Sequence, residues 1–228
     1  MGMGPGMHHY TFSKITSPSS THVATYGNTT AATPPARGSG TEFATADADN
    51  DYLDIALGED GLRAAHVCNA DAKYPYHMFK WQIPLSWTDG EGKYHAEFGD
   101  HPDNIGRIFM DWTGRGARGN GVSGWDYHAH LFVWDPWDSV WVLGAEGEGS
   151  ASDITLSVET GSQFWGYGPP SLPAGWKSRI MDGAGVVYVC AMCPLPANTG
   201  HAPVPDDPSI IRSDYLLARI AVPCGQIV

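Results

Sequence analysis

The sequence predicts an all-β protein, an antiparallel β-sandwich that is jelly-roll-like and follows an extended N-terminal arm. Stretches without Gly or Pro are short, and most are rich in β-branched and aromatic residues, which is typical of strands. Gly and Pro are abundant, at 28 and 17 residues, and indicate frequent turns. A chain of 228 residues is long enough for one large domain of this class, of which the jelly roll is a common form.

Composition divides the chain into two parts. Residues 1–41 contain no acidic residue and only Lys14 and Arg37 as fixed charges, and 19–41 is a low-complexity run of Thr, Ala, Ser, Pro and Gly. All 25 acidic residues lie in 42–228. A segment with so little to bury cannot offset its ordering entropy alone. We therefore expect residues 1–41 to be an extended arm that contacts another chain, and 42–228 to be the sandwich body.

Strands are expected throughout the body, and helices almost nowhere. The predicted strands are 105–112, 127–134, 139–143, 153–158, 185–192 and 214–222. Helix is expected at most over 50–57 and 61–70, which lack Gly and Pro apart from a first residue. The glycine-rich stretch 113–121 is expected to be a loop.

Charge and missing motifs exclude several classes of function. The net charge of −12 repels phosphate, so we expect no nucleic-acid partner. The chain contains no apolar run near the ~20 residues of a membrane span, and we expect no membrane insertion. The glycine-rich nucleotide-binding motifs and G-x-S-x-G are missing as well. We expect a soluble protein made in the cytoplasm, which then stays there, enters an assembled virion or is released outside the cell.

Two histidines separated by one residue make a candidate metal site. On a strand, His128 and His130 share one face, so both imidazoles can reach one cation. The stretch resembles the H-x-H metal motif of the cupins, with Asp135 where cupins usually place Glu. A second window at 173–178 has Ser178 where that family supplies a histidine, so the resemblance leaves the ligand set incomplete. The alternative is that both histidines lie on a solvated or interface face of the strand.

Alternating carboxylates near the start of the body make a candidate calcium site. Asp47, Asp49 and Asp51 are spaced as oxygen ligands are in calcium loops. The pattern departs from an EF-hand because Tyr52 stands where glycine is needed and Gly58 where the bidentate Glu belongs. The alternative is an acidic loop without a metal. Apart from such a structural Ca²⁺ or another divalent ion, we expect no cofactor.

Tryptophans gather between residues 125 and 141 and allow two interpretations. Facing outward, Trp134 and Trp137 could stack on a sugar ring while Asp135 and Asp138 accept hydrogen bonds from its hydroxyl groups. Facing inward, the same indoles would belong to the core of the sandwich. The core interpretation is favoured, since aromatic stripes usually serve packing.

Two arginines in the predicted loop 113–121 make a candidate interface. Arg115 and Arg118 carry forked guanidinium groups that pair with carboxylates, so they could engage an acidic patch on a neighbouring subunit. The alternative is a mobile surface loop without a partner. The spacing of Cys190 and Cys193 leaves buried thiols, a bridge and a metal site all open, with buried thiols favoured.

Three functions remain as hypotheses. The first is a structural protein of a larger assembly, such as a virion component in a capsid decoration, head fibre or tail, whose partners are other copies of itself or other subunits. The second is a carbohydrate-binding sandwich that uses the tryptophans. The third is a cupin-like metal-dependent enzyme that uses His128 and His130. Because catalytic signatures are scarce, a non-enzymatic role is favoured.

Overall fold

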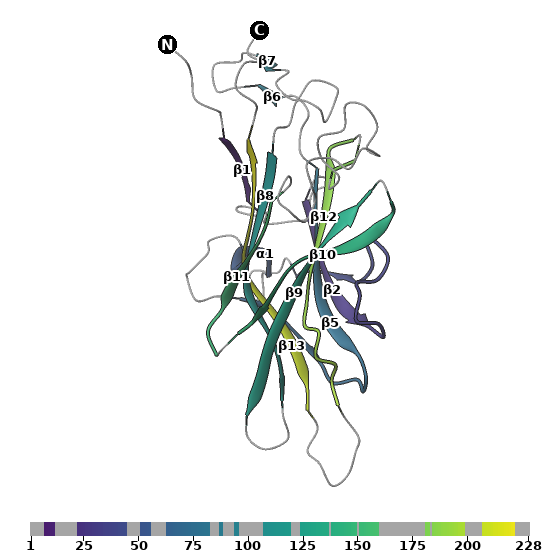
Figure 1. The fold of residues 1–228 in the computed structure, drawn as a ribbon. Helices are drawn as coiled ribbons and strands as arrows, with labels where there is room; N and C mark the ends of the chain where they lie inside the picture. The colour runs from purple at the N-terminus through teal and green to yellow at the C-terminus, as the bar shows by residue number, and fades with distance from the viewer. Residues whose placement is uncertain are drawn as a thin grey trace.

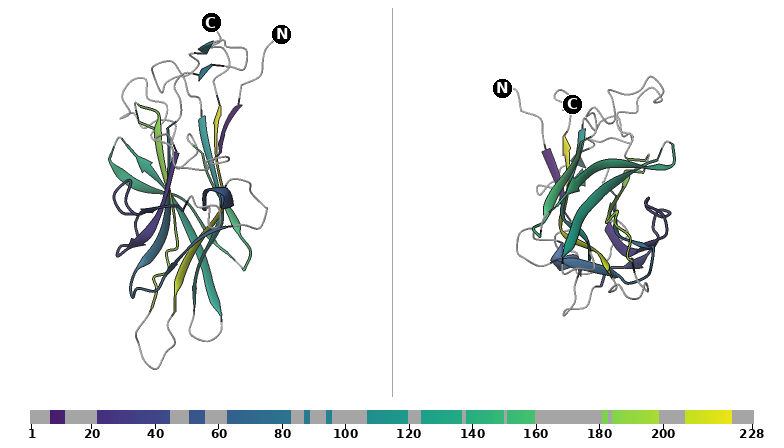
Figure 2. Two further views of the ribbon diagram at one scale, coloured as in Figure 1. Left: turned by 180° about the vertical axis from the view of Figure 1, so that it is seen from behind. Right: turned by 60° about the horizontal axis from the view of Figure 1, so that its bottom comes forward.

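Two layers of antiparallel strands make up the part of the chain that the structure describes (Figure 1). The structure is a computed structural model. It describes residues 7–11, 22–44, 51–55, 63–82, 87–88, 94–95, 107–119, 124–136, 138–149, 151–159, 181–182, 184–198 and 207–221. Eleven strands form one continuous sheet, and Figure 2 shows how this sheet curls over on itself. The predicted all-β, sandwich-like fold is confirmed.

The first layer is built on two long strands, β8 (Arg107–Gly119) and β13 (Ser209–Ala221), which pair along most of their lengths. The edge of β13 that faces away from β8 pairs with β4 (Ala64–Cys68) and β1 (Met7–Thr11). The edge of β8 that faces away from β13 pairs with β11 (Ile154–Glu159). Each of these pairs is antiparallel.

The second layer contains six strands in one antiparallel order. They are β10 (Val140–Glu148), β9 (Trp125–Asp135), β12 (Val186–Met192), β5 (Tyr74–Gln82), β2 (His22–Thr29) and β3 (Thr41–Glu42). The remaining elements are a four-residue helix and a separate two-stranded ladder. They are α1 (Asp51–Asp54), β6 (Trp87–Thr88) and β7 (Tyr94–His95).

Strand β9 belongs to both layers. Its first residues, Trp125 to Tyr127, pair with the end of β8 in the first layer. Farther along, it pairs with β12 and β10 in the second layer. In the second layer Ala129 and Leu131 are buried in the core, so the residues between and beside them face the other side. This alternation positions the histidine pair on the outer face.

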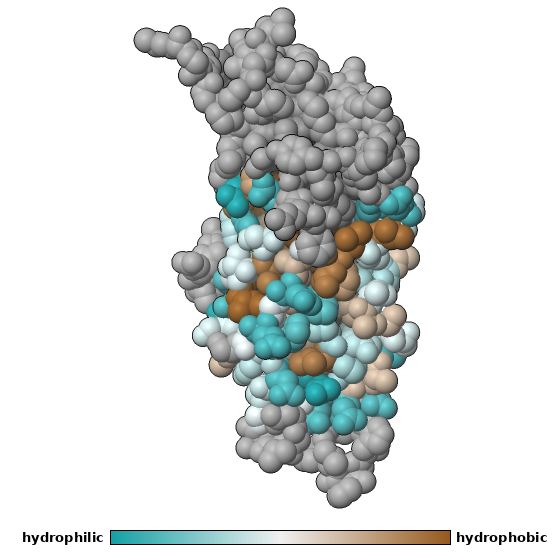
Figure 3. Space-filling model, in the orientation of Figure 1, coloured by the Kyte–Doolittle hydropathy of each residue, from teal (hydrophilic) through white to brown (hydrophobic). Residues whose placement is uncertain are grey.

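The main hydrophobic core lies between the two layers. It includes Trp112 from the first layer and Phe79 and Trp81 from the second, all fully buried. Burial of a side chain such as Phe79 contributes roughly 1.5–3 kcal/mol to stability. A second cluster, with Tyr76 and Phe132 among its members, lies on the outer face of the second layer. On the face shown in Figure 3, the described apolar residues form separate small patches among hydrophilic ones.

All six predicted strands are confirmed, but two local predictions fail. The stretch 61–70 is not helical over its described part, because residues 64–68 form β4, whose burial alternates with period two and whose backbone pairs with β13. Pairing with a long neighbour overrides the helical preference of its alanines. The glycine-rich stretch 113–121 is not a loop over its described part, because residues 113–119 continue strand β8. Only the first helical stretch, 50–57, contains a helix, the short α1.

The described residues of the predicted arm are not separate from the body. Strand β2 pairs with β5 over eight residues and buries Ala24 completely. The segment that follows packs on the outer face of the second layer, where Arg37 stacks on Trp134 and Tyr188. An edge strand needs little core of its own, because its backbone hydrogen bonds are completed by its neighbour. The described residues 22–41 thus pack on the body, while the expected contact of residues 1–41 with another chain stays a prediction.

Candidate metal centre

Strand β9 presents His128 and His130 together on the outer face of the second layer. Their neighbours Ala129 and Leu131 point into the main core, which fixes the direction of the two imidazoles. The ring centroids lie 4.9 Å apart with an angle of 77° between the planes. The structure thus places both histidines on one face of the strand, as the sequence predicted.

A third ligand comes from the neighbouring strand. Glu146 of β10 lies directly opposite His130, and its Oε2 is 3.4 Å from Nε2 of that histidine. One ligand atom from each of His128, His130 and Glu146 lies within 4.8 Å of the others. Two imidazoles and a carboxylate therefore converge on one point at the surface.

A bulge in β10 produces this convergence. The register of β9 and β10 shifts between Leu143 and Ala145. Without this shift Glu146 would stand opposite Ala129, on the core-facing side of the ladder. Because of the shift, Glu146 stands opposite His130 and Glu148 opposite His128. The bulge thus places both carboxylates on the face that carries the histidines.

Burial prepares the two imidazoles to bind a cation. The side chain of His130 is 18% exposed, and burial lowers its pKa, with a further lowering from nearby His128 and an opposing effect of Glu146. A lowered pKa keeps the imidazole neutral, which is its metal-binding form. Nε2 of His128 is buried and has no hydrogen-bond partner among the described residues. A bound ion would give this nitrogen a partner.

The residue types suit a zinc-like ion, and one of the three separations between ligand atoms matches it. Metal–ligand bonds of about 2.0–2.1 Å in a tetrahedral site place neighbouring ligand atoms about 3.3–3.5 Å apart. The His130–Glu146 pair is already at 3.4 Å, and the Glu146 side chain is 62% exposed and free to adjust. Imidazole nitrogens suit zinc and its transition-metal neighbours, whereas Ca²⁺ and Mg²⁺ prefer oxygen ligands.

Family models and curated sequences give no guide to this cluster. No family model matches the chain. No curated protein matches it in sequence. The chemistry of the cluster therefore rests on the side chains described above.

None of the helices within the described residues has the length and apolar character needed to cross a membrane.

Asp135 does not join the histidines. It is buried at the end of β9, where its Oδ1 accepts a hydrogen bond of 3.1 Å from the backbone N–H of Asp138. This contact shapes the turn into β10. The third member of the cluster is instead Glu146, which the sequence analysis did not single out. The alternating Glu146-Gly-Glu148 pattern indicates two carboxylates on one face of the following strand, but it does not indicate that they lie opposite the histidines.

The predicted calcium site lies mostly outside the described residues. Asp47 and Asp49 are both in the part that the structure does not describe. Asp51 begins helix α1, and its side chain lies outside the described set as well. Ser178 of the second cupin-like window is also outside it. The calcium site stays a prediction.

The predicted tryptophan platform is divided. Trp134 has one ring face covered by Arg37, whose guanidinium carbon is 4.6 Å from the ring centroid. Trp141 packs edge-on against Trp134 at 5.4 Å. The indole N–H of Trp141 donates to the backbone oxygen of Pro35. Trp137 lies outside the described residues. Trp134 therefore packs against the chain's own residues.

Arg115 and Arg118 lie on strand β8 rather than on a loop, and each has contacts within the chain. Arg115 lies 3.9 Å from Asp153, and Arg118 forms an ion pair of 3.3 Å with Asp126. These contacts leave their predicted role in an interface untested.

The described cysteines, Cys68, Cys190 and Cys193, are free and buried. Burial raises the pKa of Cys190 and of Cys193, so both are neutral thiols at neutral pH. Neutral buried thiols are poor nucleophiles and poor metal ligands. Among the three interpretations that the sequence left open, the structure favours buried thiols for this pair.

Proposed function

We propose that this protein binds a divalent transition-metal ion, best matched by zinc, at His128, His130 and Glu146. The observation that carries the proposal is the convergence of three ligand atoms within 4.8 Å on one face of β9 and β10. The unsatisfied buried Nε2 of His128 supports it, because the nitrogen would be satisfied by a bound ion.

Three protein ligands leave a coordination position open. Zinc sites with three protein ligands keep a water in the fourth position, whereas closed structural sites use four protein ligands. Glu148 lies opposite His128 and is exposed, so a rotation of its side chain would supply a fourth ligand and close the site. With either coordination, the ion would link β9 to β10 across the bulge.

Titration of the full-length, EDTA-treated chain with zinc chloride in a calorimeter tests the proposal. We expect one equivalent of zinc to bind. His130→Asn and Glu146→Gln should each weaken binding by more than the roughly 10–100-fold that loss of an outer-shell partner costs. The matched control is His8→Asn combined with His9→Asn, which removes the other adjacent histidine pair of the sequence. Equal binding by wild type and Glu146→Gln would overturn the assignment.

Cobalt(II) identifies the ligand type independently. A site of two imidazoles and a carboxylate gives ligand-field bands of cobalt without thiolate charge-transfer absorption. Because the pKa values of Cys190 and Cys193 are raised, we expect no such absorption. A strong thiolate band that survives His128→Asn would assign the metal to cysteines and contradict the proposal.

A second candidate is the assembly role. It is supported by the composition of residues 1–41, which carry no acidic residue ahead of an acidic body. Self-association predicts a mass in solution well above the 24.5 kDa of one chain, measured by light scattering. Deletion of residues 1–21, which precede β2, should reduce this mass and leave the body folded. A wild-type chain that is monomeric at high concentration would argue against this candidate.

A further inference from the structure

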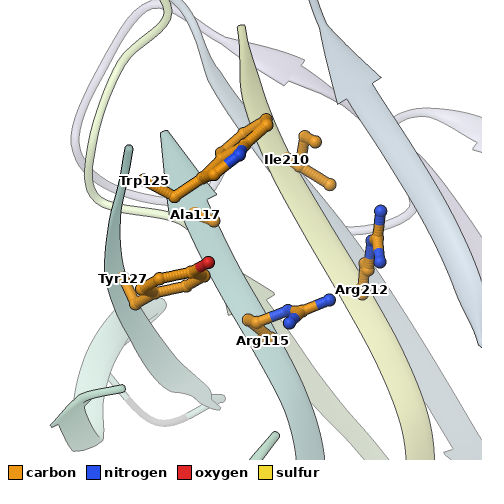
Figure 4. A pocket seen from close by; sticks show the side chains of 6 residues that line it. All are labelled: Arg115, Ala117, Trp125, Tyr127, Ile210 and Arg212. Carbon is orange, nitrogen blue, oxygen red and sulfur yellow. The ribbon is translucent and has the colours of Figure 1, made fainter. Parts of the chain in front are cut away.

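A small pocket lies where three strands of the first layer run side by side (Figure 4). It is lined by Trp125 and Tyr127 of β9, Arg115 and Ala117 of β8, and Ile210 and Arg212 of β13. Its volume is about 150 Å³. Trp112 of β8 points into the main core. Arg115 and Ala117 lie on the opposite face of the strand, so the pocket opens away from the core.

The polar side of this pocket gathers positive charge. Arg115 of the lining and the nearby Arg63 both lie beside the carboxylate of Asp153, at 3.9 Å and 2.5 Å. The pKa of Arg212 is lowered by burial and then by the nearby Arg115 and Arg63, while Asp153 opposes this effect. Three guanidinium groups thus gather near the carboxylate of Asp153, and two of them, Arg115 and Arg212, line the pocket. On a chain with a net charge of −12, such a gathering of arginines favours an anionic ligand.

The other side of the pocket is aromatic and accessible. Trp125 is 41% exposed, one of the few large apolar side chains of the described residues that are open to solvent. The guanidinium of Arg115 lies 5.8 Å from the ring centroid of Tyr127, so the aromatic and cationic sides adjoin. Figure 4 shows the two aromatic side chains coming from β9 and Arg115 reaching across the pocket toward Arg212. A ligand there meets a flat apolar surface and charged donors together.

We propose that this pocket binds the carboxylate-bearing terminal sugar of an acidic glycan. A guanidinium fork matches the two oxygens of a carboxylate, and Arg115 already lies beside such a group in Asp153. The apolar face of the sugar ring would lie against Trp125. The volume is below the roughly 300–1,000 Å³ of pockets that enclose a drug-sized ligand, so only one end of a longer ligand fits.

The chain's own charge selects among anions. A carboxylated sugar brings one negative charge, whereas phosphate groups and nucleic acids bring more and are repelled more strongly by the acidic body. The pocket shares no residue with the metal cluster, so this proposal is independent of the metal.

Nuclear magnetic resonance titration of the full-length chain tests the proposal. The probes are methyl β-D-glucuronide and N-acetylneuraminate, and the matched control ligand is methyl β-D-glucoside, which lacks the carboxylate. The signal to follow is the indole N–H of Trp125, assigned by its loss in Trp125→Phe. We expect at least one acidic sugar to shift this signal with a Kd near or below about 1 mM, and the glucoside to bind about tenfold more weakly or worse.

Two variants and one control locate the site. Arg212→Gln should weaken binding of the acidic sugar about tenfold or more, because it removes a charged donor. Trp125→Ala, at an exposed position, should weaken binding without loss of the fold, and here the backbone amide signals of Ala117 and Tyr127 report binding in place of the indole. Lys80→Gln removes one positive charge from the second layer and should leave binding unchanged.

Three results would overturn the inference. The first is that neither acidic sugar shifts the Trp125 signal. The second is that Arg212→Gln binds as well as the wild type. The third is that benzoate or inorganic phosphate binds the pocket more tightly than the acidic sugars, which would assign it to another class of anion.

Discussion

At the scale of single residues, Ser213 joins the two layers through a buried polar contact. Its hydroxyl oxygen accepts a hydrogen bond of 2.8 Å from the indole N–H of Trp112 in the first layer. The same hydroxyl lies 2.9 Å from Nδ1 of His77 in the second layer. The pKa of His77 is lowered to about 3 by burial and by nearby His66, so its imidazole is neutral. A neutral Nδ1 can then accept the hydroxyl hydrogen.

Ser213→Ala should destabilise the protein by about 2–4 kcal/mol. The substitution leaves two buried polar atoms, one on Trp112 and one on His77, without a partner, and each such atom costs roughly 1–3 kcal/mol. Urea unfolding measures the change. The control is Ser157→Ala, which removes an exposed hydrogen bond to Asp111 and should cost less than about 1 kcal/mol. Equal effects of the two substitutions would contradict the proposed bridge.

At the scale of elements, glycines shape strand β8 where it lies closest to its neighbours. A Cβ on Gly116 would meet the carbonyl oxygen of His128, and a Cβ on Gly114 would meet that of Arg212. Both obstacles are backbone atoms, which cannot move aside cheaply. The glycines that indicated a loop therefore serve close backbone approach within a strand.

Gly116→Ala should cost at least the roughly 1–3 kcal/mol of an overpacked core position. Because the clash involves the peptide of His128, the same substitution should also weaken zinc binding. Thermal unfolding and zinc titration measure the two effects. The control is Gly149→Ala, whose Cβ would be 3.4 Å from that of Tyr127, an ordinary contact. If Gly116→Ala were as stable as that control, the close approach would be refuted.

Local signals in the sequence predict the strands, whereas nonlocal contacts decide which strands pair and in which register. The alternation around His128 and His130 could be predicted, because a strand's two faces follow from period two. The position of Glu146 beside the histidines could not be predicted, because its place opposite His130 depends on a bulge that shifts the register by one residue. Likewise, β2 has too few large apolar residues to be recognised alone, and it is ordered by its pairing with β5.

At the scale of the whole molecule, the inner face of the second layer is covered and its outer face is covered in part. The inner face packs against the first layer, and the outer face carries the second cluster, against which residues of the predicted arm are placed. Backbone N–H of Gly38 lies 3.3 Å from the sulfur of Met78, and Arg37 covers Trp134. The metal cluster and the arginine pocket share strand β9 but no residue.

Buried histidines make the stability of the whole molecule depend on pH. Burial lowers the pKa values of His22, His66 and His130, and it lowers that of His77 from its ordinary 6.5 to about 3. Below pH 6.5 the unfolded chain therefore binds protons that the folded chain does not. The free energy of unfolding should be constant with respect to these groups above that pH and fall as the pH is lowered toward 3.

Comparison of wild type with His77→Asn isolates the largest of these contributions. From neutral pH to about pH 5, His77 alone should lower the free energy of unfolding by at most about 2 kcal/mol, at 1.36 kcal/mol per pKa unit. Asn offers a polar atom near the position of Nδ1 and does not titrate, so the contact with Ser213 can persist while this pH dependence is lost. Urea unfolding of both proteins across this range measures the difference. A wild type that loses no more stability than His77→Asn on acidification would show that His77 takes up its proton in the folded state, which is incompatible with its burial between Phe43, Phe79 and Ser213.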